Sequence, residues 1–150
     1  MKKLAILVVV VVSACRTAAV GSPVPANAPG AASPRDAVQR FLKAAKNQDV
    51  QDFGLAWGTQ DGPAMKDKEG RDERETREQR EIVQFCYLKH DTYQVLGEAP
   101  ARNAERVLAV ELKYKDLTRP ANFMVTRGPS NRWYVRQFDI EALRDICAKR

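Results

Sequence analysis

The hydrophobic pattern of this chain changes its period at His90. Before His90, apolar side chains recur at helical spacing, most clearly within residues 34–47, where they are Val38, Phe41, Leu42 and Ala45. After it, apolar and polar side chains alternate, most clearly in residues 107–114. The first pattern is typical of an amphipathic helix and the second of a strand with one buried face. The sequence therefore predicts an α+β domain in which helices precede a sheet.

Two capped helices are expected first. Residues 33–36 supply an N-cap serine, a proline at the first helical position and an acid three residues after the cap, so a helix begins there and ends near Asn47. Asp49 repeats the cap before a shorter helix. The side chains of Val50, Phe53 and Trp57 are expected to face the core from this helix. The glycines and the proline within residues 58–63 are expected to end it.

A third helical segment, residues 66–81, contains six basic and seven acidic residues. Opposite charges fall four residues apart, as in Glu73 and Arg77, and each such pair contributes about 0.2–0.5 kcal/mol. We interpret the segment as a solvated helix face. Burial is expected to begin at the apolar residues that follow, which are Ile82, Val83, Phe85, Cys86 and Leu88. The alternative is a surface that docks onto another protein.

Four strands and a closing helix are expected after His90. The strands are residues 93–95, 107–114, 122–126 and 132–138, with turn regions at 97–103 and 128–131. Because consecutive strands with short links pair with their neighbours, these four predict an antiparallel meander. A short C-terminal helix is predicted from the spacing of Ile140, Leu143 and Cys147.

The N-terminus has the order of a secretory signal. A positive segment, residues 1–3, precedes the uncharged apolar residues 4–12 and then Ser13, Ala14 and Cys15. A spanning helix needs about 20 apolar residues, so this run is too short to be a permanent span. Residues 12–15 resemble the bacterial lipobox, which implies removal of the signal and attachment of diacylglycerol and palmitate to Cys15. An ordinary secretory signal with a chance cysteine is the alternative.

The lipobox resemblance sets the expected boundaries. Residues 1–14 are the signal peptide, residues 15–32 are the lipidated cysteine with a flexible tether of Ala, Pro and Gly, and residues 33–150 are the folded domain. Arg16 stands where an aspartate retains lipoproteins of Proteobacteria at the inner membrane. The implied location is the cell envelope, with the periplasmic face of the outer membrane favoured over the inner membrane.

Composition limits the partners and sites of this chain. Removal of the signal takes away two of the 25 basic residues, and the remaining excess over the 19 acidic residues is too small to predict a nucleic-acid partner. One histidine and three cysteines build neither a His-rich metal site nor a four-cysteine zinc site. We expect no metal and no cofactor.

Two cysteines remain once Cys15 carries lipid. Cys86 and Cys147 are roughly 60 residues apart, and an envelope compartment is oxidising, so we expect a disulfide between them. By chain entropy, closing a loop of that length is worth roughly 4 kcal/mol. Two free, buried cysteines are the alternative.

A second resemblance concerns the folded domain. It is carried by the order of the predicted elements and by three stretches, residues 33–45, 47–50 and 132–136. Together they resemble the nuclear transport factor 2-like superfamily, whose fold is called the cystatin-like cone, and within it small bacterial lipoproteins of unknown function. The resemblance implies N-terminal helices packed on a curved antiparallel four-stranded sheet, with a conical pocket open at one end. The short helix that carries Cys147 is extra to that fold.

Aromatic side chains are the candidates for lining such a pocket. They are Trp57, Tyr93, Trp133 and Tyr134, with Phe41 and Phe123 beside them. Aromatic and apolar lining is usual for a small-molecule site. It is equally usual for a core, so both interpretations stay open.

The sequence predicts a non-enzymatic envelope lipoprotein that binds a partner protein or a small apolar ligand, with no catalytic residue. The alternative is a small-pocket enzyme of isomerase or hydrolase type that uses His90, beside Asp91, or a pocket carboxylate. A histidine at a helix end also has a structural role, because a cation there complements the helix dipole. A third hypothesis is a module that docks onto an envelope protein through residues 66–81.

Overall fold

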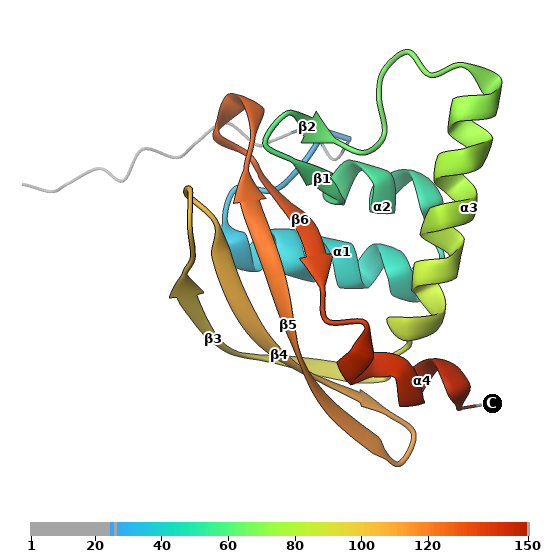
Figure 1. Cartoon of the computed structure of the whole chain (residues 1–150), viewed down its shortest axis with the longest axis vertical. Coiled ribbons are helices and arrows are strands. Elements are labelled where there is room, and N and C mark those ends of the chain that lie inside the picture. The colour runs from blue at the N-terminus through green and yellow to red at the C-terminus, as the bar shows by residue number, and fades with distance from the viewer. Residues whose placement is uncertain (1–24, 26, 150) are drawn as a thin grey trace, which may run out of the picture.

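The structure, a computed structural model, describes residues 25 and 27–149 and is α+β (Figure 1). Its helices and strands are α1 (Pro34–Asn47), α2 (Val50–Ala56), β1 (Gly58–Thr59), β2 (Gly62–Pro63), α3 (Arg71–Tyr87), β3 (Thr92–Pro100), β4 (Arg106–Tyr114), β5 (Leu117–Arg127), β6 (Trp133–Phe138) and α4 (Arg144–Ala148). Short 3-10 turns, Pro129–Asn131 and Glu141–Leu143, flank β6. The predicted α+β class, with a four-stranded antiparallel sheet and a short closing helix, is confirmed, whereas the short strands β1 and β2 come before α3 and were not predicted.

The predicted caps begin α1 and α2. The Ser33 hydroxyl accepts the backbone N–H of Asp36 at 3.1 Å. The Asp49 carboxylate accepts the backbone N–H of Asp52 at 3.0 Å. Each bond satisfies one of the N–H groups that a helix start leaves without a partner. The break expected after α2 is the β1–β2 hairpin.

The strands β3, β4, β5 and β6 pair in that order, each antiparallel to its neighbour, which confirms the predicted meander. Figure 1 shows this sheet curving around α1. Leu108, Val110 and Leu112 of β4 are fully buried in one cluster with Phe41 and Leu42 of α1. Burying a side chain of this size contributes about 1.5–3 kcal/mol, so this layer holds the helices on the sheet.

Two strands are longer than predicted. β3 continues to Pro100 through the expected turn, because a register shift after Val95 lets it bend and still pair with β4. β5 begins before its expected start and includes Pro120. A residue without an N–H is tolerated there because β6 pairs with β5 only from Phe123 onward.

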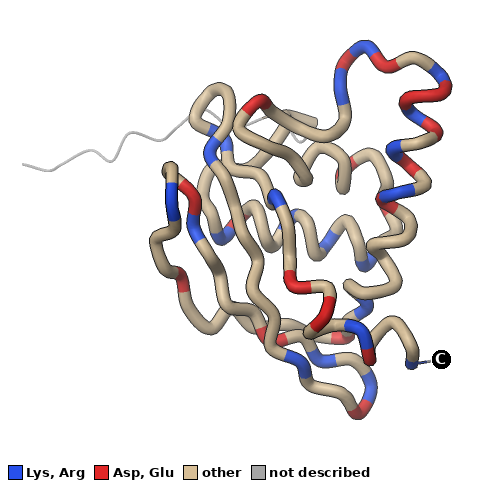
Figure 2. The backbone as a smooth tube through the Cα atoms, viewed as in Figure 1, with Lys and Arg blue, Asp and Glu red and all other residues tan. Residues whose placement is uncertain are grey.

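The inward face of α3 differs from the prediction. It is formed by buried residues three or four positions apart, which are Arg77, Glu81, Phe85 and Leu88. Ile82 and Val83 fall beside this face and are 54% and 58% exposed, so their predicted burial is wrong. Figure 2 shows acidic and basic residues alternating along the first half of α3. The predicted solvated face is correct for most of these charges and wrong for Arg77 and Glu81.

The last residues of the predicted tether pack on the domain. Ala31 is buried and pairs with Trp133 at the edge of β6. The guanidinium groups of Arg40 and Arg132 donate to backbone carbonyls within residues 28–30. These bonds satisfy backbone groups that the small side chains of this segment leave without partners. The packed segment therefore includes residues 28–31, ahead of the expected domain start at residue 33.

A disulfide joins α3 to α4. The sulfur atoms of Cys86 and Cys147 are 2.01 Å apart, and the predicted pairing is present in the structure. Leu143 and Ile146 beside it are fully buried, so the C-terminal helix is held both covalently and by packing.

The predicted signal peptide and Cys15 lie outside the described residues, as does most of the predicted tether. Within the described part of the chain, no helix has the length and apolar composition that crossing a membrane requires. The lipid anchor therefore stays a prediction from the sequence.

Candidate ligand-binding groove

Phenylalanine rings fill the space between α1 and the sheet. Phe41 stacks on Phe53 with ring centroids 4.2 Å apart, and Phe41 meets Phe123 edge-on at 6.4 Å. Phe138 stacks on Phe123 at 5.7 Å. Phe53 meets Phe85 of α3 edge-on at 4.9 Å. These five phenylalanine rings are all buried in one core cluster.

The four aromatic residues predicted to line a pocket do not meet around one. Trp133 and Tyr134 are neighbours in β6, so they point to opposite faces, and only Trp133 joins the core cluster. Trp57 packs at the edge of that cluster, and its indole N–H donates to a backbone carbonyl of β6 at 3.0 Å. Tyr93 also packs at the edge of the cluster, edge-on to His90 with ring centroids 5.5 Å apart, and it lines a second hollow. They serve core packing more than ligand lining.

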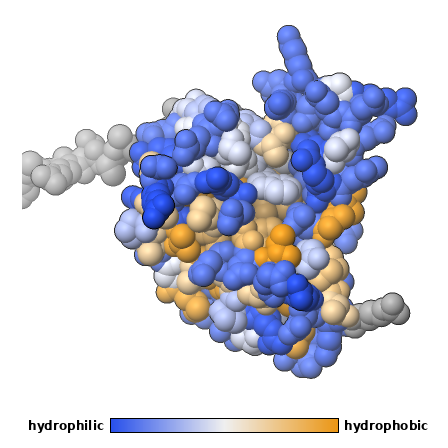
Figure 3. All heavy atoms as spheres, viewed as in Figure 1, coloured by the Kyte–Doolittle hydropathy of each residue, from blue (hydrophilic) through white to orange (hydrophobic). Residues whose placement is uncertain are grey.

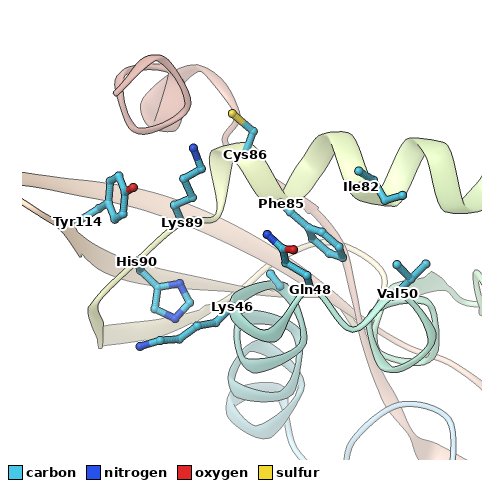
Figure 4. Close-up of a pocket in the computed structure, with 10 residues that line it drawn as sticks. Lys46, Gln48, Val50, Ile82, Phe85, Cys86, Lys89, His90 and Tyr114 are labelled. Atoms are coloured by element: carbon cyan, nitrogen blue, oxygen red, sulfur yellow. The ribbon is translucent and has the colours of Figure 1, made fainter. Parts of the chain in front are cut away.

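A groove opens beside the filled core, where α1, α2, α3 and the end of β4 come together (Figure 4). Its volume is about 540 Å³, within the range of small-molecule sites. Figure 4 shows a polar end formed by Lys46, Lys89, His90 and Tyr114. It also shows an apolar end formed by Val50 and Ile82, with Phe85 and Gln48 between the two ends.

The polar end of the groove is cationic. Lys46 donates from Nζ to the backbone carbonyl of Asp91 at 2.7 Å. The Nζ atom of Lys89 lies 6.0 Å from the centroid of the Tyr114 ring. Among the residues described, neither lysine forms an ion pair with a carboxylate, and no acidic side chain lines the groove. This end therefore attracts anions.

His90 lies at the polar end as a buried side chain. It is 6% exposed, and its Nδ1 lies 2.7 Å from the carbonyl oxygen of Leu88, so Nδ1 carries the proton. Burial lowers the pKa of His90 below its ordinary 6.5, and the charge of Lys46 lowers it further. The lowered pKa disfavours the helix-end cation that the sequence suggested. The Asp91 carboxylate accepts the backbone N–H of Lys115 at 2.7 Å, which leaves the predicted His90 and Asp91 pair without a joining hydrogen bond.

A second hollow, of about 730 Å³, shares Lys46 and His90 with the groove. Its lining contains three acidic and three basic residues. Arg40 and Asp52 form an ion pair there at 2.6 Å. Because acids stand among its bases, this hollow lacks the cationic excess of the groove.

A buried ion cluster lies where α3 meets α2. Arg77 donates from Nη1 to Oε2 of Glu81 at 2.7 Å and from Nε to Oε1 of Glu69 at 3.0 Å. Oε1 of Glu81 has no hydrogen-bond partner among the described residues. A Cβ on Gly54 of α2 would come within 2.8 Å of this atom, so the glycine makes room for the cluster. Burial raises the pKa of Glu81 to about 7, against the lowering effect of its hydrogen bond with Arg77.

This raised pKa predicts a pH-dependent stability. The folded protein keeps a proton on Glu81 that the unfolded chain releases above pH 4.5, so the stabilisation is lost as the pH rises through about 7. Relative to Glu81→Gln, the wild type is expected to gain about 2 kcal/mol of unfolding free energy between pH 8 and pH 5. Urea unfolding of both proteins at several pH values measures this difference. The opposing effect of His90 is present in both and cancels, and a constant difference would contradict the prediction.

Sequence analysis missed most of the groove residues. Lys46, Lys89 and Tyr114 come from separate parts of the chain, and single lysines belong to no motif. One signal was present, because the mostly apolar segment 82–88 leads directly into Lys89 and His90. That run places apolar and basic side chains side by side at the end of a helix.

Comparisons with known proteins found no relative of this chain. No protein-family model matches it, and neither the curated proteins nor the solved structures that were searched contain a match. Among residues 25 and 27–149, no three His, Cys, Asp or Glu side chains are grouped as a metal site requires. The groove and the N-terminal sequence are therefore the features that bear on the function of this chain.

Proposed function

We propose that this chain is a non-enzymatic lipoprotein of the cell envelope that binds a small, largely apolar ligand in the groove between α1 and α3. The observation that carries the proposal is the groove itself, which has an apolar end and a cationic end beside a core that is already filled. Apolar lining with a few polar groups is the usual composition of a ligand site.

The nuclear transport factor 2-like cone remains our proposal for the fold family. A capped N-terminal helix inside a curved antiparallel meander supports it. In this chain the phenylalanine rings close the cone, and the ligand site moves to the groove at its side. The outer membrane, facing the periplasm, is the proposed location, because Arg16 follows the lipobox cysteine.

The other two hypotheses have less support. A small-pocket enzyme needs a base oriented by a partner, whereas the Asp91 carboxylate is engaged with the Lys115 backbone and does not orient His90. Docking onto a partner protein through the charged helix is less favoured because Arg77 is buried against Glu81 and Glu69, where a partner cannot contact it.

We predict that Cys15→Ser releases the protein from membranes. Without the thiol no diacylglycerol is attached, and the described domain contains no helix that crosses a membrane. Fractionation of cells by ultracentrifugation is expected to move the protein from the membrane pellet to the soluble fraction.

A matched variant controls for changes near the cleavage site. Ala14→Gly keeps a small residue before the cysteine, so this protein is expected to stay in the pellet. If Cys15→Ser remains in the pellet after a high-salt wash although its signal peptide has been removed, the lipid anchor is refuted.

A further inference from the structure

We propose that the ligand of the groove is an anionic amphiphile, a molecule with one acidic head group and a short apolar chain. The inference rests on the proposed function, because it names the ligand chemistry of the same groove. It follows from the way charge and apolar surface separate along the groove in Figure 4.

The acidic head group is assigned to the end that holds Lys46 and Lys89. A lysine ammonium has three donors, and Lys46 uses one of them on the backbone carbonyl of Asp91. Lys89 contacts only the face of Tyr114 among the interactions of the described residues. No carboxylate of the described residues forms an ion pair with either lysine, so an anion supplied by a ligand would form charge-assisted hydrogen bonds here.

The apolar chain is assigned to the other end. Phe85 forms part of the floor and is 8% exposed, whereas Ile82 beside it is 54% exposed. Figure 3 shows apolar surface over the lower half of α3, below its charged first half. A ligand chain lying on Ile82 and Val50 removes this surface from water, which is the main driving force for apolar binding.

The neighbouring hollow shows why charge decides the ligand class. Both hollows contain Lys46 and His90, yet only the groove lacks acidic side chains. A cationic ligand is repelled by the two lysines, and an uncharged one leaves them without an anionic partner. An acid with an apolar chain satisfies both ends at once.

Binding of three ten-carbon probes tests the inference. Decanoate, 1-decanol and decylamine are titrated by calorimetry into the full chain carrying Cys15→Ser, so that no acyl chain or detergent competes. We expect decanoate to bind roughly tenfold more tightly than 1-decanol, because one charge-assisted hydrogen bond contributes a free energy that corresponds to about this ratio of affinities. Decylamine is expected to bind most weakly.

Two lysine variants assign the head group within the groove. Lys89→Gln is expected to weaken decanoate binding roughly tenfold and to leave 1-decanol unchanged. Lys43→Gln is the matched control, because Lys43 lies on the same helix as Lys46 but lines only the second hollow. This control is expected to change neither affinity.

A third variant tests the apolar end. Ile82→Ser alters an exposed side chain that the core does not need, and it is expected to weaken decanoate and 1-decanol alike. Thermal unfolding of each variant confirms that it is folded.

The outcomes separate the two proposals. Equal affinities for decanoate and 1-decanol, tightest binding of decylamine, or equal losses in Lys43→Gln and Lys89→Gln overturn the anionic head group and leave a ligand-binding groove. If none of the three probes binds, the proposed ligand-binding function itself is overturned.

Discussion

Replacing Arg77 with alanine is expected to lower the free energy of unfolding by about 3–5 kcal/mol at pH 8. The Arg77 side chain is 7% exposed and holds the carboxylates of Glu81 and Glu69 at the α2–α3 contact. Its loss leaves the fully buried Glu81 charge without compensation. Because the pKa of Glu81 is already raised to about 7, protonation relieves part of this cost at pH 5, where a smaller loss is expected. Urea unfolding followed by tryptophan fluorescence measures both values.

Two comparisons make this prediction specific to the buried cluster. Arg74→Ala removes an exposed arginine of the same helix and is expected to change the free energy by at most about 0.5 kcal/mol. The triple variant Arg77→Met, Glu81→Leu and Glu69→Gln removes all three charges of the cluster, and it is expected to recover most of the lost stability. Similar losses in Arg77→Ala and Arg74→Ala would contradict the structure of α3.

Replacing Cys147 with serine is expected to lower the free energy of unfolding by roughly 4 kcal/mol. The disulfide closes a separation of 61 residues between α3 and α4, so its removal frees a long loop in the unfolded chain. The packing of Leu143 and Ile146 is still available to hold the C-terminal helix in the folded variant. Thermal or urea unfolding under oxidising conditions measures the loss.

The same bond is tested in the wild type by reduction. Dithiothreitol is expected to lower the stability of the wild type to that of Cys147→Ser and to leave the variant unchanged. The double variant Cys86→Ser with Cys147→Ser is expected to match the single one. A wild type whose stability is unaffected by complete reduction would contradict a structural role for the disulfide.

Local signals predicted most of the helices and strands. The caps at Ser33 and Asp49 are formed as predicted, because capping depends on residues three positions apart in the chain. The alternation in β4 also predicted its buried face, since strand geometry alone sends neighbouring side chains to opposite sides. The strand ends were less predictable, because the bulge after Val95 and the extension through Pro120 depend on which strands lie alongside.

The buried face of α3 could not be predicted from local sequence patterns. Hydrophobicity predicts that Ile82 and Val83 are buried and that Arg77 and Glu81 are exposed, and the structure shows the reverse. Glu69 and Gly54 explain the difference, since one neutralises Arg77 and the other makes room for the Glu81 carboxylate. Neither contact is visible before the loop and the two helices are placed in space.

The candidate site was the least predictable part. Aromatic composition indicated a pocket of Trp57, Tyr93, Trp133 and Tyr134, but Trp133 lies in the core cluster, Trp57 and Tyr93 pack at its edge, and Tyr134 is buried outside it. The groove combines residues of α1, α2, α3 and β4, and its lysines resemble ordinary surface residues in the sequence. A site assembled from distant segments without a motif becomes visible only in the folded structure.

The intact mass of protein extracted from membranes tests the central claim, a domain anchored by lipid on Cys15, most directly. We predict a polypeptide that begins at Cys15 and carries the added mass of diacylglycerol and one further acyl chain. Proteolytic cleavage within the tether is expected to leave a domain fragment without this added mass. A polypeptide that begins at Met1, or at a later residue than Cys15, and carries no lipid would contradict the account.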